Sequence, residues 1–520
     1  MGIYLNPGTS QFQEAVTREI YVDKSMLIDY MNYAMDKGNK YVCVSRPRRF
    51  GKSTDANMLV AYYTKDADSS SLFEQLKISQ AKSYSRHLNR HLVIHVDMQN
   101  FLSVNDCIEN MIHDLTECIS YELFDKYPDI RFFKKDNLSR ILLQIHAQTH
   151  DQFVFIIDEW DCVFREYKFD KKAQEQYLDF LRLLFKGQPY VSFVYMTGIL
   201  PIKKYGTHSA LNMFKEISML NPTPLEAFMG FTESEVKNLC EQYHMDYEEM
   251  QSWYNGYHFN DGLSIYSPRS VISAIEDHKF GNYWTNTETY EALKVYIDMN
   301  FDGLKDAIVK LLAGERVNVN TTKFQNDMTT FDSKDDVFTL LIHLGYLGYD
   351  ETYKQVYIPN YEVTDSFVNS IETSDWKETT KALQNSRDLL EATWKQDADR
   401  VAEYIQESHL HTSILQYNDE NALSYTLLLA YYTARDYYTI IREMPSGKGY
   451  ADLVFLPKKS EPAMVVELKW NKEVKTAIDQ IRGKNYIHGL EKYLGNLLLV
   501  GITYDKNTKE HKCLIERYEG

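Results

Sequence analysis

Four runs of apolar residues in the first 200 positions restrict the folds open to this chain. They are YVCVS (41–45), HLVIHVDM (91–98), FVFIIDE (153–159) and VSFVYMTG (191–198). Helical patterns separate them, near residues 52–63, 106–124, 137–149 and 171–186. Continuous apolar strands that alternate with helices are typical of a mostly parallel sheet covered on both faces. The sequence therefore predicts an α/β fold here, with EISML (216–220) as a candidate fifth strand.

The sequence pattern changes after NPTPL (221–225), where helical patterns with aromatic loops replace the alternation of strands and helices. Residues 335–360 predict a helix followed by a two-stranded ribbon, a winged-helix-like pattern. A last α/β unit has strands at 449–457, 463–470 and 496–504 and a helix at 472–494. Because 520 residues exceed one ordinary hydrophobic core, we expect several domains. The expected parts are an α/β domain at 1–220, a helical and winged-helix-like region at 221–404 and an α/β domain at 405–520.

Charge and cysteine usage restrict the setting in which the chain works. The formal net charge of −17 argues against a protein that coats nucleic acid. Residues 441–520 differ, because they carry 14 Lys and Arg against 11 Asp and Glu, so contact with phosphate is expected in this tail. The six cysteines lie far apart, and no apolar run has the length of a membrane span. These features predict a cytoplasmic protein with reduced thiols and no membrane partner.

The segment SRPRRFGKST (45–54) follows the first predicted strand and opens a predicted helix. It fits the phosphate-binding pattern G-x-x-x-x-G-K-[ST] except that Arg46 replaces the first glycine. In such a loop, backbone N–H groups at the start of the helix surround the phosphates. Lys52 would reach the β- and γ-oxygens, and the Ser53 hydroxyl would bind Mg²⁺.

Pro47 can replace the missing glycine in this turn by fixing φ, and the three arginines add positive charge around the expected anion. The alternative is a basic, solvated turn capped by serine, since a bare G-K-[ST] arises by chance about 0.3 times in a chain of this length. The residues expected to bind nucleotide are Arg46, Arg48, Arg49, Gly51, Lys52, Ser53 and Thr54.

The strand FVFIIDEWD ends in two adjacent acids. Beside a phosphate loop, Asp158 would hold the water shell of Mg²⁺, and Glu159 would polarise the attacking water. Thr197, which closes the neighbouring strand VYMTG, is a candidate sensor of the γ-phosphate. The alternative for the acidic pair is a charged turn at the end of a strand. No arginine is assigned as a finger supplied to a second copy of the chain, although Arg165 and Arg182 are candidates.

Five motifs agree in order with a known family: YVDKS (21–25), SRPRRFGKST, LFEQLKIS (72–79), FIIDEWD and WYNGYHF (253–259). Together they resemble the AAA-ATPase-like family of bacterial proteins over roughly residues 5–290. In that family R-P-R-R-F-G-K-[ST] is the usual form of the loop, so the resemblance implies that Arg46 belongs to a working ATP site. The family's D-E-Y-D is D-E-W-D here. Residues 253–259 are expected to pack in the core, and a lid over the base is the alternative.

The C-terminal tail brings two acids and a lysine together. Asp452 begins the strand ADLVFLP, a turn at 457–462 reverses the chain, and MVVELK returns as a second strand. Glu467 and Lys469 share one face of that strand because side chains alternate, and Asp452 can approach them across the ribbon. Carboxylate oxygens suit Mg²⁺ or Mn²⁺, which promote phosphodiester hydrolysis. The alternative is an ordinary hairpin whose charges protect an edge.

This tail is similar to the PD-(D/E)xK nuclease superfamily over roughly residues 405–515, on EMPSGKGYADLVFLP, AMVVELKW and AIDQIRGKNY. The resemblance implies a restriction-endonuclease-like α/β domain with Asp452, Glu467 and Lys469 at the signature positions. It also suggests Glu443 as a further acidic ligand and Gln480 as a residue that positions the lysine or the substrate. Tyr486 departs from the Q-x-x-x-Y spacing of the RecB-like subgroup, so that subgroup is not assigned.

Together the two sites predict a P-loop domain that binds and hydrolyses ATP, coupled to a nuclease that uses Mg²⁺ or Mn²⁺. The alternative is a nucleotide-dependent switch whose C-terminal domain binds nucleic acid or a partner without cleaving it. Expected partners are nucleotide, nucleic acid (DNA ahead of RNA) and a second copy of the chain. The expected catalytic residues are Lys52, Asp158, Glu159, Asp452, Glu467 and Lys469. The expected metal ligands are Ser53, Asp158, Asp452 and Glu467.

Overall fold

The computed structural model describes residues 2–202, 211–259, 262–284, 290–299, 301–325, 328–329, 331–372, 377–411, 427–428, 430–446, 449–483 and 490–518. These residues form two compact units. Unit 1 comprises Met1–Thr287 and Asn318–Val363, and unit 2 comprises Glu288–Val317 and Thr364–Gly520. Each unit is therefore built from two separate stretches of chain. The sequence suggested three consecutive parts, and that division stays a prediction.

A five-stranded parallel sheet forms the centre of the first part of unit 1, as the sequence predicts. The strand order is β2-β3-β4-β1-β5. All six residues of β3 are buried, which explains its unbroken apolar run. The candidate fifth strand is confirmed, although it begins earlier and is shorter than expected. The strands are β1 (Tyr41–Ser45), β2 (Leu92–Asp97), β3 (Phe153–Asp158), β4 (Val191–Gly198) and β5 (Lys215–Ile217).

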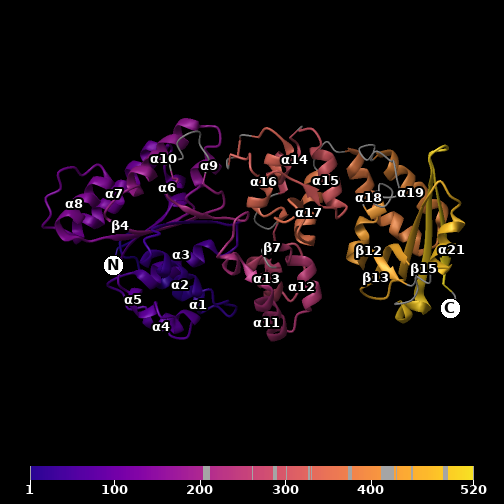
Figure 1. The fold of residues 1–520 in the computed structure, drawn as a ribbon, viewed down its shortest axis with the longest axis horizontal. Helices are drawn as coiled ribbons and strands as arrows, with labels where there is room; N and C mark the ends of the chain where they lie inside the picture. Colours follow the sequence, from indigo (N-terminus) through magenta and orange to yellow (C-terminus); the bar gives the residue numbers. More distant parts are fainter. Residues whose placement is uncertain are drawn as a thin grey trace. The chain divides into compact units, whose positions relative to one another are not determined.

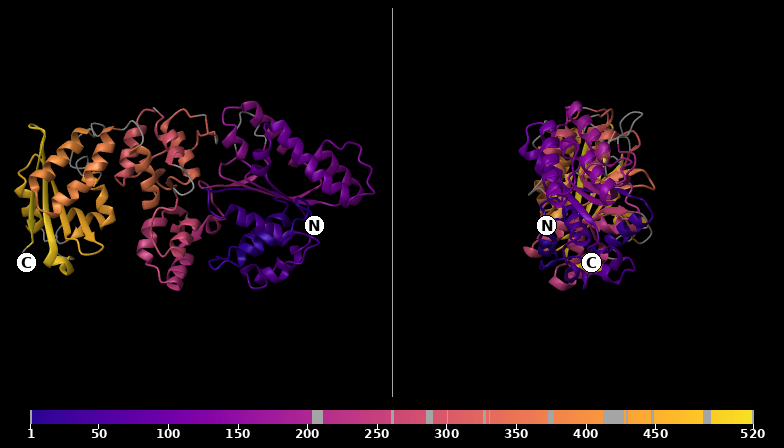
Figure 2. Two further views of the ribbon diagram at one scale, coloured as in Figure 1. Left: turned by 180° about the vertical axis from the view of Figure 1, so that it is seen from behind. Right: turned by 90° about the vertical axis from the view of Figure 1, so that its left-hand side faces the viewer.

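Helices cover both faces of this sheet, seen from the front in Figure 1 and from behind in Figure 2. One layer, drawn in indigo, contains α1 (Ser10–Val16), α2 (Met26–Asp36), α3 (Lys52–Tyr63), α4 (Ser70–Phe73) and α5 (Tyr84–His87). The purple layer contains α6 (Met98–Val104), α7 (Ile108–Lys126), α8 (Leu138–Thr149), α9 (Cys162–Glu166) and α10 (Lys171–Phe185). Parallel pairing brings the carboxyl ends of the strands to one edge, with Asp97 beside Asp158 and Ser45 beside Gly198.

The remainder of unit 1 begins with a three-stranded antiparallel sheet of order β6-β8-β7 and its helices. These elements are η2 (Glu226–Phe228), β6 (Phe231–Thr232), α11 (Glu233–Tyr243), α12 (Tyr247–Tyr254), β7 (Tyr257–Phe259), β8 (Leu263–Tyr266) and α13 (Pro268–Glu276). Tyr254 and Tyr257 are buried, and the Tyr257 hydroxyl donates to the Gly345 carbonyl at 2.6 Å. The middle of the aromatic segment 253–259 therefore packs in the core, as expected, whereas Trp253 and Phe259 are partly buried and His258 is exposed.

The expected helix and ribbon of the 335–360 region are present as α16 (Lys334–Leu344), β10 (Gly348–Asp350) and β11 (Gln355–Tyr357). A third short strand, β9 (Val317–Asn318), joins the ribbon in the order β10-β11-β9. The helices that follow or precede it in the chain are α14 (Tyr290–Ile297), α15 (Leu304–Leu312), α17 (Tyr361–Glu372), α18 (Lys377–Trp394) and α19 (Ala398–His411).

Unit 2 contains a mixed five-stranded sheet of order β12-β13-β14-β15-β16, parallel only between β14 and β15. Its elements are β12 (Tyr438–Ser446), β13 (Gly449–Pro457), β14 (Ala463–Trp470), α21 (Lys475–Gly483), β15 (Leu497–Asp505) and β16 (Glu510–Arg517). The expected helix over 472–494 is wrong in extent: α21 ends at Gly483, residues 484–489 lie outside the described part, and η5 (Glu491–Asn496) follows. The last strand, β16, was not predicted from the sequence.

Two apolar cores cover the two faces of this sheet. One contains Val401 and Ile405 of α19 with Phe455 and Val466 of the sheet. The other contains Ile478 and Ile481 of α21 with alternate residues of the same strands, including Val454 and Val465. Because side chains alternate along β14, Glu467 points to the face that α21 covers. No described helix is both long enough and apolar enough to cross a bilayer.

Candidate functional site

The phosphate loop lies between the end of β1 and the first residue of α3, Lys52. Gly51 caps the helix with φ 83°, a left-handed conformation that glycine adopts without strain. Arg49 shares this region with φ 66°. The path of the chain thus places the backbone N–H groups of Ser53 and Thr54 in the first turn of α3, where they have no carbonyl partner within the helix and favour an anion.

Lys52 lies close to the acidic pair at the end of β3. Its side chain is buried, and Nζ donates to the Pro47 carbonyl at 3.1 Å. Burial lowers the pKa of Lys52, while the negative charges of Glu159 and Asp158 act in the opposite direction. The structure therefore brings the lysine and the acidic pair to the same edge of the sheet, as the sequence reading requires.

Glu159 has an unusual backbone for a non-glycine residue, with φ 51°. Its N–H donates to Asp158 Oδ1 at 2.9 Å, and its carboxylate accepts from Arg165 Nη2. Burial raises the pKa of Glu159, although Lys52 and Arg165 oppose this shift. Strained backbone at such a position is common at functional sites. The carboxylate is thus fixed at the cavity wall beside two cations.

Two of the expected residues lie inside the protein and not on the cavity wall. Asp158 is buried, and the Thr197 hydroxyl donates to the Val44 carbonyl at 2.9 Å. Of the two arginine-finger candidates, Arg165 pairs with Glu159 of its own chain and lies 3.4 Å from Asp161. Arg182 pairs with Asp179 on the surface at 2.9 Å.

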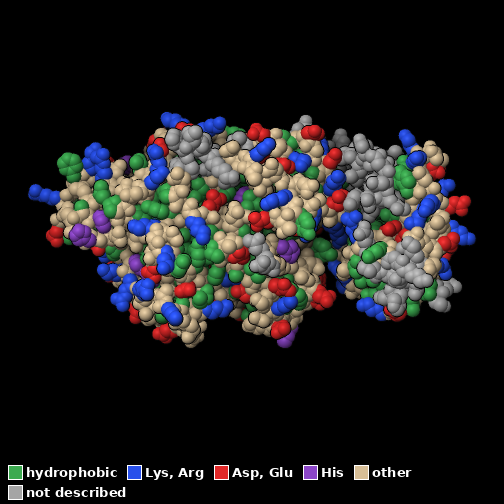
Figure 3. Space-filling model, viewed as in Figure 1, with side chains coloured by type: hydrophobic (Ala, Val, Ile, Leu, Met, Phe, Trp, Pro, Cys, Tyr) green, Lys and Arg blue, Asp and Glu red, His purple; other side chains and the backbone are tan. Residues whose placement is uncertain are grey.

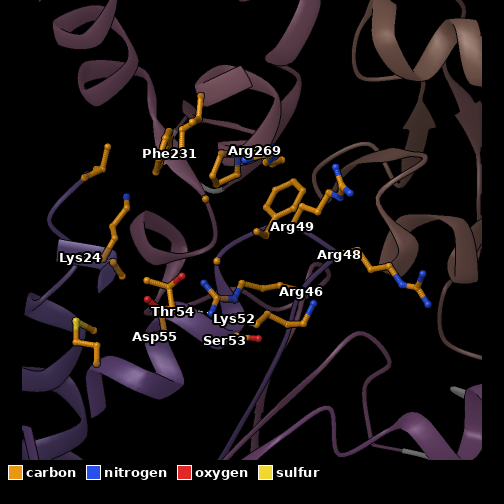
Figure 4. A pocket seen from close by; sticks show the side chains of 18 of the residues that line it. Lys24, Arg46, Arg48, Arg49, Lys52, Ser53, Thr54, Asp55, Phe231 and Arg269 are labelled. Carbon is orange, nitrogen blue, oxygen red and sulfur yellow. Dashed lines mark hydrogen bonds and ion pairs between the residues drawn. The ribbon is translucent and has the colours of Figure 1, made fainter. Parts of the chain in front are cut away.

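A cavity of about 1090 Å³ opens above the phosphate loop (Figure 4). Loop residues and Glu159 line it together with residues from α13 and from the segment before α2. The sequence reading missed Arg18, Lys24, Phe231 and Arg269 in this wall, because distant parts of the chain supply them. The cationic lining residues are Arg18, Lys24, Arg46, Arg48, Arg49, Lys52, Arg165 and Arg269, and the acidic ones are Glu19, Asp55, Asp97, Glu159, Glu166 and Glu276.

Three residues of the YVDKS motif make contacts that hold the fold together. Asp23 Oδ2 accepts from the Lys77 N–H at 2.7 Å, and Ser25 Oγ accepts from the Ile78 N–H at 3.0 Å. These bonds join YVDKS to LFEQLKIS. Lys24 Nζ forms an ion pair with Glu235 at 2.6 Å.

Arg46 is more strongly engaged than a simple phosphate ligand would be. It is 2% exposed, although part of it reaches the cavity wall. Nη2 donates to Asp55 Oδ2 at 2.6 Å, and Nη1 donates to the Phe228 carbonyl at 2.5 Å. In Figure 4 Arg48 extends away from the group that Arg46, Lys52 and Asp55 form.

The acids and the lysine of the tail meet on β13 and β14. The antiparallel pairing of Leu453 with Val466, continued by one residue, brings Asp452 opposite Glu467. Asp452 Oδ2 accepts from the Leu468 N–H at 2.7 Å, and Lys469 Nζ donates to Glu467 Oε1 at 2.9 Å. Gln480 of α21 donates to the same Glu467 oxygen. The structure therefore gathers four of the expected residues.

Glu467 supplies a test of whether this cluster suits a divalent cation. Its carboxylate is buried, and Oε2 has no hydrogen-bond partner. Burial, followed by the negative charge of Asp452, raises the pKa of Glu467 to about 7. A buried oxygen without a partner next to a second carboxylate fits a hard cation.

The described residues contain no group of three or more His, Cys, Asp or Glu arranged to hold a metal. Among the described side chains of this cluster, Asp452 and Glu467 are the two acids that could hold a cation. Of Glu443 only the backbone, in β12, is described, and Tyr486 lies outside the described residues.

Two family models match separate parts of the chain: one described as predicted AAA-ATPase matches residues 7–207, and one described as PD-(D/E)XK nuclease superfamily matches residues 419–513. A curated relative is the uncharacterized protein in the vnfD 5′ region of Azotobacter chroococcum mcd 1. It is 26% identical over 280 residues, which are 52% of this chain and 51% of the relative. The chain thus spans about half the length of the curated relative that it matches.

Solved structures similar to the chain include the Walker-type ATPase paby2304 of Pyrococcus abyssi. The identity is 13% with a TM-score of 0.35, over 68% of this chain and 97% of that one. The ORC2 protein of Aeropyrum pernix, in ADPNP and ADP complexes, is 11% identical with a TM-score of 0.24, over 69% and 98% of the two chains. From the family models and its own sheets, the chain carries an AAA-ATPase-like domain at residues 7–207 and a PD-(D/E)XK nuclease superfamily domain at residues 419–513.

Proposed function

We propose that the chain binds and hydrolyses ATP in the cavity above the phosphate loop and that its C-terminal domain cleaves nucleic-acid phosphodiesters. The observation that carries the first part is the meeting of Lys52, the start of α3 and Glu159 around one cavity. Lys52 would contact the β- and γ-phosphate oxygens, and Glu159 would polarise the attacking water as a general base. A Mg²⁺ ion near Ser53 and Asp158 would neutralise charge on the phosphates.

The ATP site is tested by titrating the full chain with MgATP and by measuring phosphate release. Lys52→Ala should abolish detectable ATP binding, because it removes the cation that meets the phosphates. Lys65→Ala is the matched control, since Lys65 is exposed just beyond the far end of the same helix. Unchanged affinity in Lys52→Ala would contradict the proposed ATP site.

The observation that carries the second part is the buried, partnerless Oε2 of Glu467 beside Asp452 and Lys469. Asp452 and Glu467 would hold Mg²⁺ or Mn²⁺, which supplies Lewis-acid stabilisation of charge on a phosphodiester. Lys469 would orient the attacking water or pair with the phosphate, and Gln480 would hold the Glu467 carboxylate in place. Both activities suit a cytoplasmic protein that acts on DNA.

Cleavage is tested on circular and linear DNA and on RNA, with Mg²⁺, with Mn²⁺ and with a chelator. Asp452→Asn and Glu467→Gln should lose cleavage at least about 100-fold, since each removes a charged ligand. Glu473→Gln changes an exposed acid of the same domain and should cleave normally. Binding of nucleic acid without cleavage under every metal condition would instead favour the nucleotide-dependent switch.

A further inference from the structure

An arginine occupies the position at which the phosphate-loop pattern expects its first glycine. Both ends of the Arg46 guanidinium are held inside the protein, by Asp55 at 2.6 Å and by the Phe228 carbonyl at 2.5 Å. The Arg46 N–H also donates to the Gly198 carbonyl, at 3.0 Å. The side chains of Arg46 and Asp55 are 2% and 7% exposed. Solvent therefore screens this ion pair little.

The ion pair joins the two ends of the loop. Arg46 is the first residue after β1, and Asp55 lies in the first turn of α3, so residues 47–51 are closed between them. Within that stretch Arg49 and Gly51 have φ values of 66° and 83°. The surrounding structure must hold a non-glycine residue in the left-handed region, because that conformation is intrinsically unfavourable. The buried pair supplies such a constraint.

A second, partly buried cation links the neighbouring wall of the cavity to the same turn. Lys24 Nζ donates to the Ala227 carbonyl at 2.7 Å and pairs with Glu235 at 2.6 Å. Arg46 and Lys24 thus donate to consecutive carbonyls of η2, the turn that leads to Phe231 at the cavity wall. The loop and this wall are fixed to each other by two cations.

We propose that Arg46 and Asp55 are positioning residues of the nucleotide site. Their ion pair closes the phosphate loop across its ends, in place of the tight turn that glycine provides, while Lys52 and Arg49 meet the phosphate charge. This inference rests on the proposed binding of ATP. It makes a prediction opposite in sign to simple electrostatics, because Asp55 lines the cavity and its charge alone would repel phosphate.

The test measures MgATP affinity by calorimetry and thermal unfolding in the full-length protein. Asp55→Asn removes a negative charge with little change of shape. If the pair positions the loop, Asp55→Asn should bind MgATP about tenfold more weakly. Arg46→Lys should behave likewise, because a lysine cannot reach both partners of the guanidinium. Glu241→Gln, which removes an exposed acid of α11 outside the cavity wall, is the control and should leave binding unchanged.

If Arg46 were a phosphate ligand, Asp55→Asn would release it and remove repulsion, so equal or tighter binding would overturn the inference. A purely stabilising role would lower the unfolding temperature and leave the affinity of the folded protein unchanged, which would also overturn it. Should either single variant not fold, Arg46→Met with Asp55→Met replaces the pair by apolar side chains and is read by the same affinity measurement. If wild type binds no MgATP, the proposed function itself fails; the wild-type and Lys52→Ala titrations distinguish that failure from this one.

Discussion

Both candidate sites hold a carboxyl group whose surroundings oppose its ionisation. For Glu159 and for Glu467 burial is the largest influence on the pKa, and a neighbouring cation, Lys52 or Lys469, works against it. Groups whose burial and charged neighbours compete in this way are typical of catalytic sites. A general base and a metal ligand both need a carboxylate that is held in place and released from its proton when substrate or cation arrives.

The pKa of Glu467 predicts a pH-dependent stability. At a pH between the ordinary pKa of 4.5 and the folded pKa of about 7, the Glu467 carboxyl has lost its proton in the unfolded chain and retains it in the folded protein. The contribution of Glu467 to the free energy of unfolding is therefore fully present below pH 4.5. It is lost as the pH rises to about 7, and the loss is on the order of 3 kcal/mol. Glu467→Gln removes the titration, so its free energy of unfolding relative to wild type should increase across this window.

The measurement is denaturant unfolding from pH 4.5 to 8 in the presence of a chelator. Glu473→Gln serves as the control, because Glu473 is exposed in the same domain. Parallel stability curves for wild type and Glu467→Gln would show that the carboxyl does not titrate as described.

At the scale of the elements, hydrophobic periodicity predicted where the strands lie in the sequence, but it predicted less well which residues contact one another. The strands at 41–45 and 191–198 and the helix at 52–63 were predicted with their observed bounds, because each buries an apolar run or follows a turn signal. β16 was missed because EHKCLIER alternates polar and apolar residues only weakly.

The sequence predicted the strands that carry Asp158, Asp452 and Glu467, but it could not reveal the partners of Arg46. Asp55 is nine residues away and Phe228 is 182 residues away. A carbonyl has no signature in a sequence, and a single acid in a helix is an ordinary surface residue. Only the fold shows that both meet one guanidinium.

Gly501 allows α21 to approach the sheet closely, because glycine has no Cβ. Gly501 pairs with Glu467 across β14 and β15. A Cβ added there would lie 3.0 Å from Ala477 Cβ and 3.1 Å from the Val474 carbonyl. Gly501→Ala should therefore push α21 outward, loosen the contact between Gln480 and Glu467, and destabilise the protein by about 1–3 kcal/mol. Denaturant unfolding measures the loss, and Gly495→Ala, whose Cβ would meet no atom within 4 Å, should have little effect.

At the scale of the whole molecule, unit 1 depends on a stretch that returns from later in the chain. Glu362 is buried and accepts from Ser270 Oγ at 2.9 Å and from the N–H groups of Tyr283 and Trp284 at 2.7 and 2.6 Å. These partners are 78 to 92 residues away. Such a contact between distant stretches has no signature in the order of consecutive segments along the chain.

Glu362→Ala should destabilise unit 1 by about 2–4 kcal/mol, because a buried N–H group, a partly buried N–H group and a hydroxyl lose their acceptor. Thermal unfolding with and without MgATP would report the loss, and Glu351→Ala, at an exposed position of the same returning stretch, is the control. Equal stability of the two variants would show that the closure contributes little.

If the ATPase-like domain controls the nuclease domain, nuclease rates should depend on the nucleotide. We expect MgATP to change the cleavage rate of wild type, since a ligand shifts a conformational equilibrium whenever it binds one state better. Lys52→Ala should cleave at the nucleotide-free rate under all conditions. A rate that is the same with and without nucleotide in both proteins would mean that the two activities are independent.

On the face seen in Figure 3 the described acidic and basic side chains are interspersed, so nucleic acid is expected to engage a local site.

The bridge across the phosphate loop has a consequence for the divergence of related chains. A glycine can be retained by itself, whereas two opposite charges are useful only together, since either one alone would be buried without a counterion. Positions 46 and 55 should therefore change together among related chains. Homologues that exchange the arginine for glycine should have lost the aspartate as well, and an alignment deep enough to measure this covariation would reveal it.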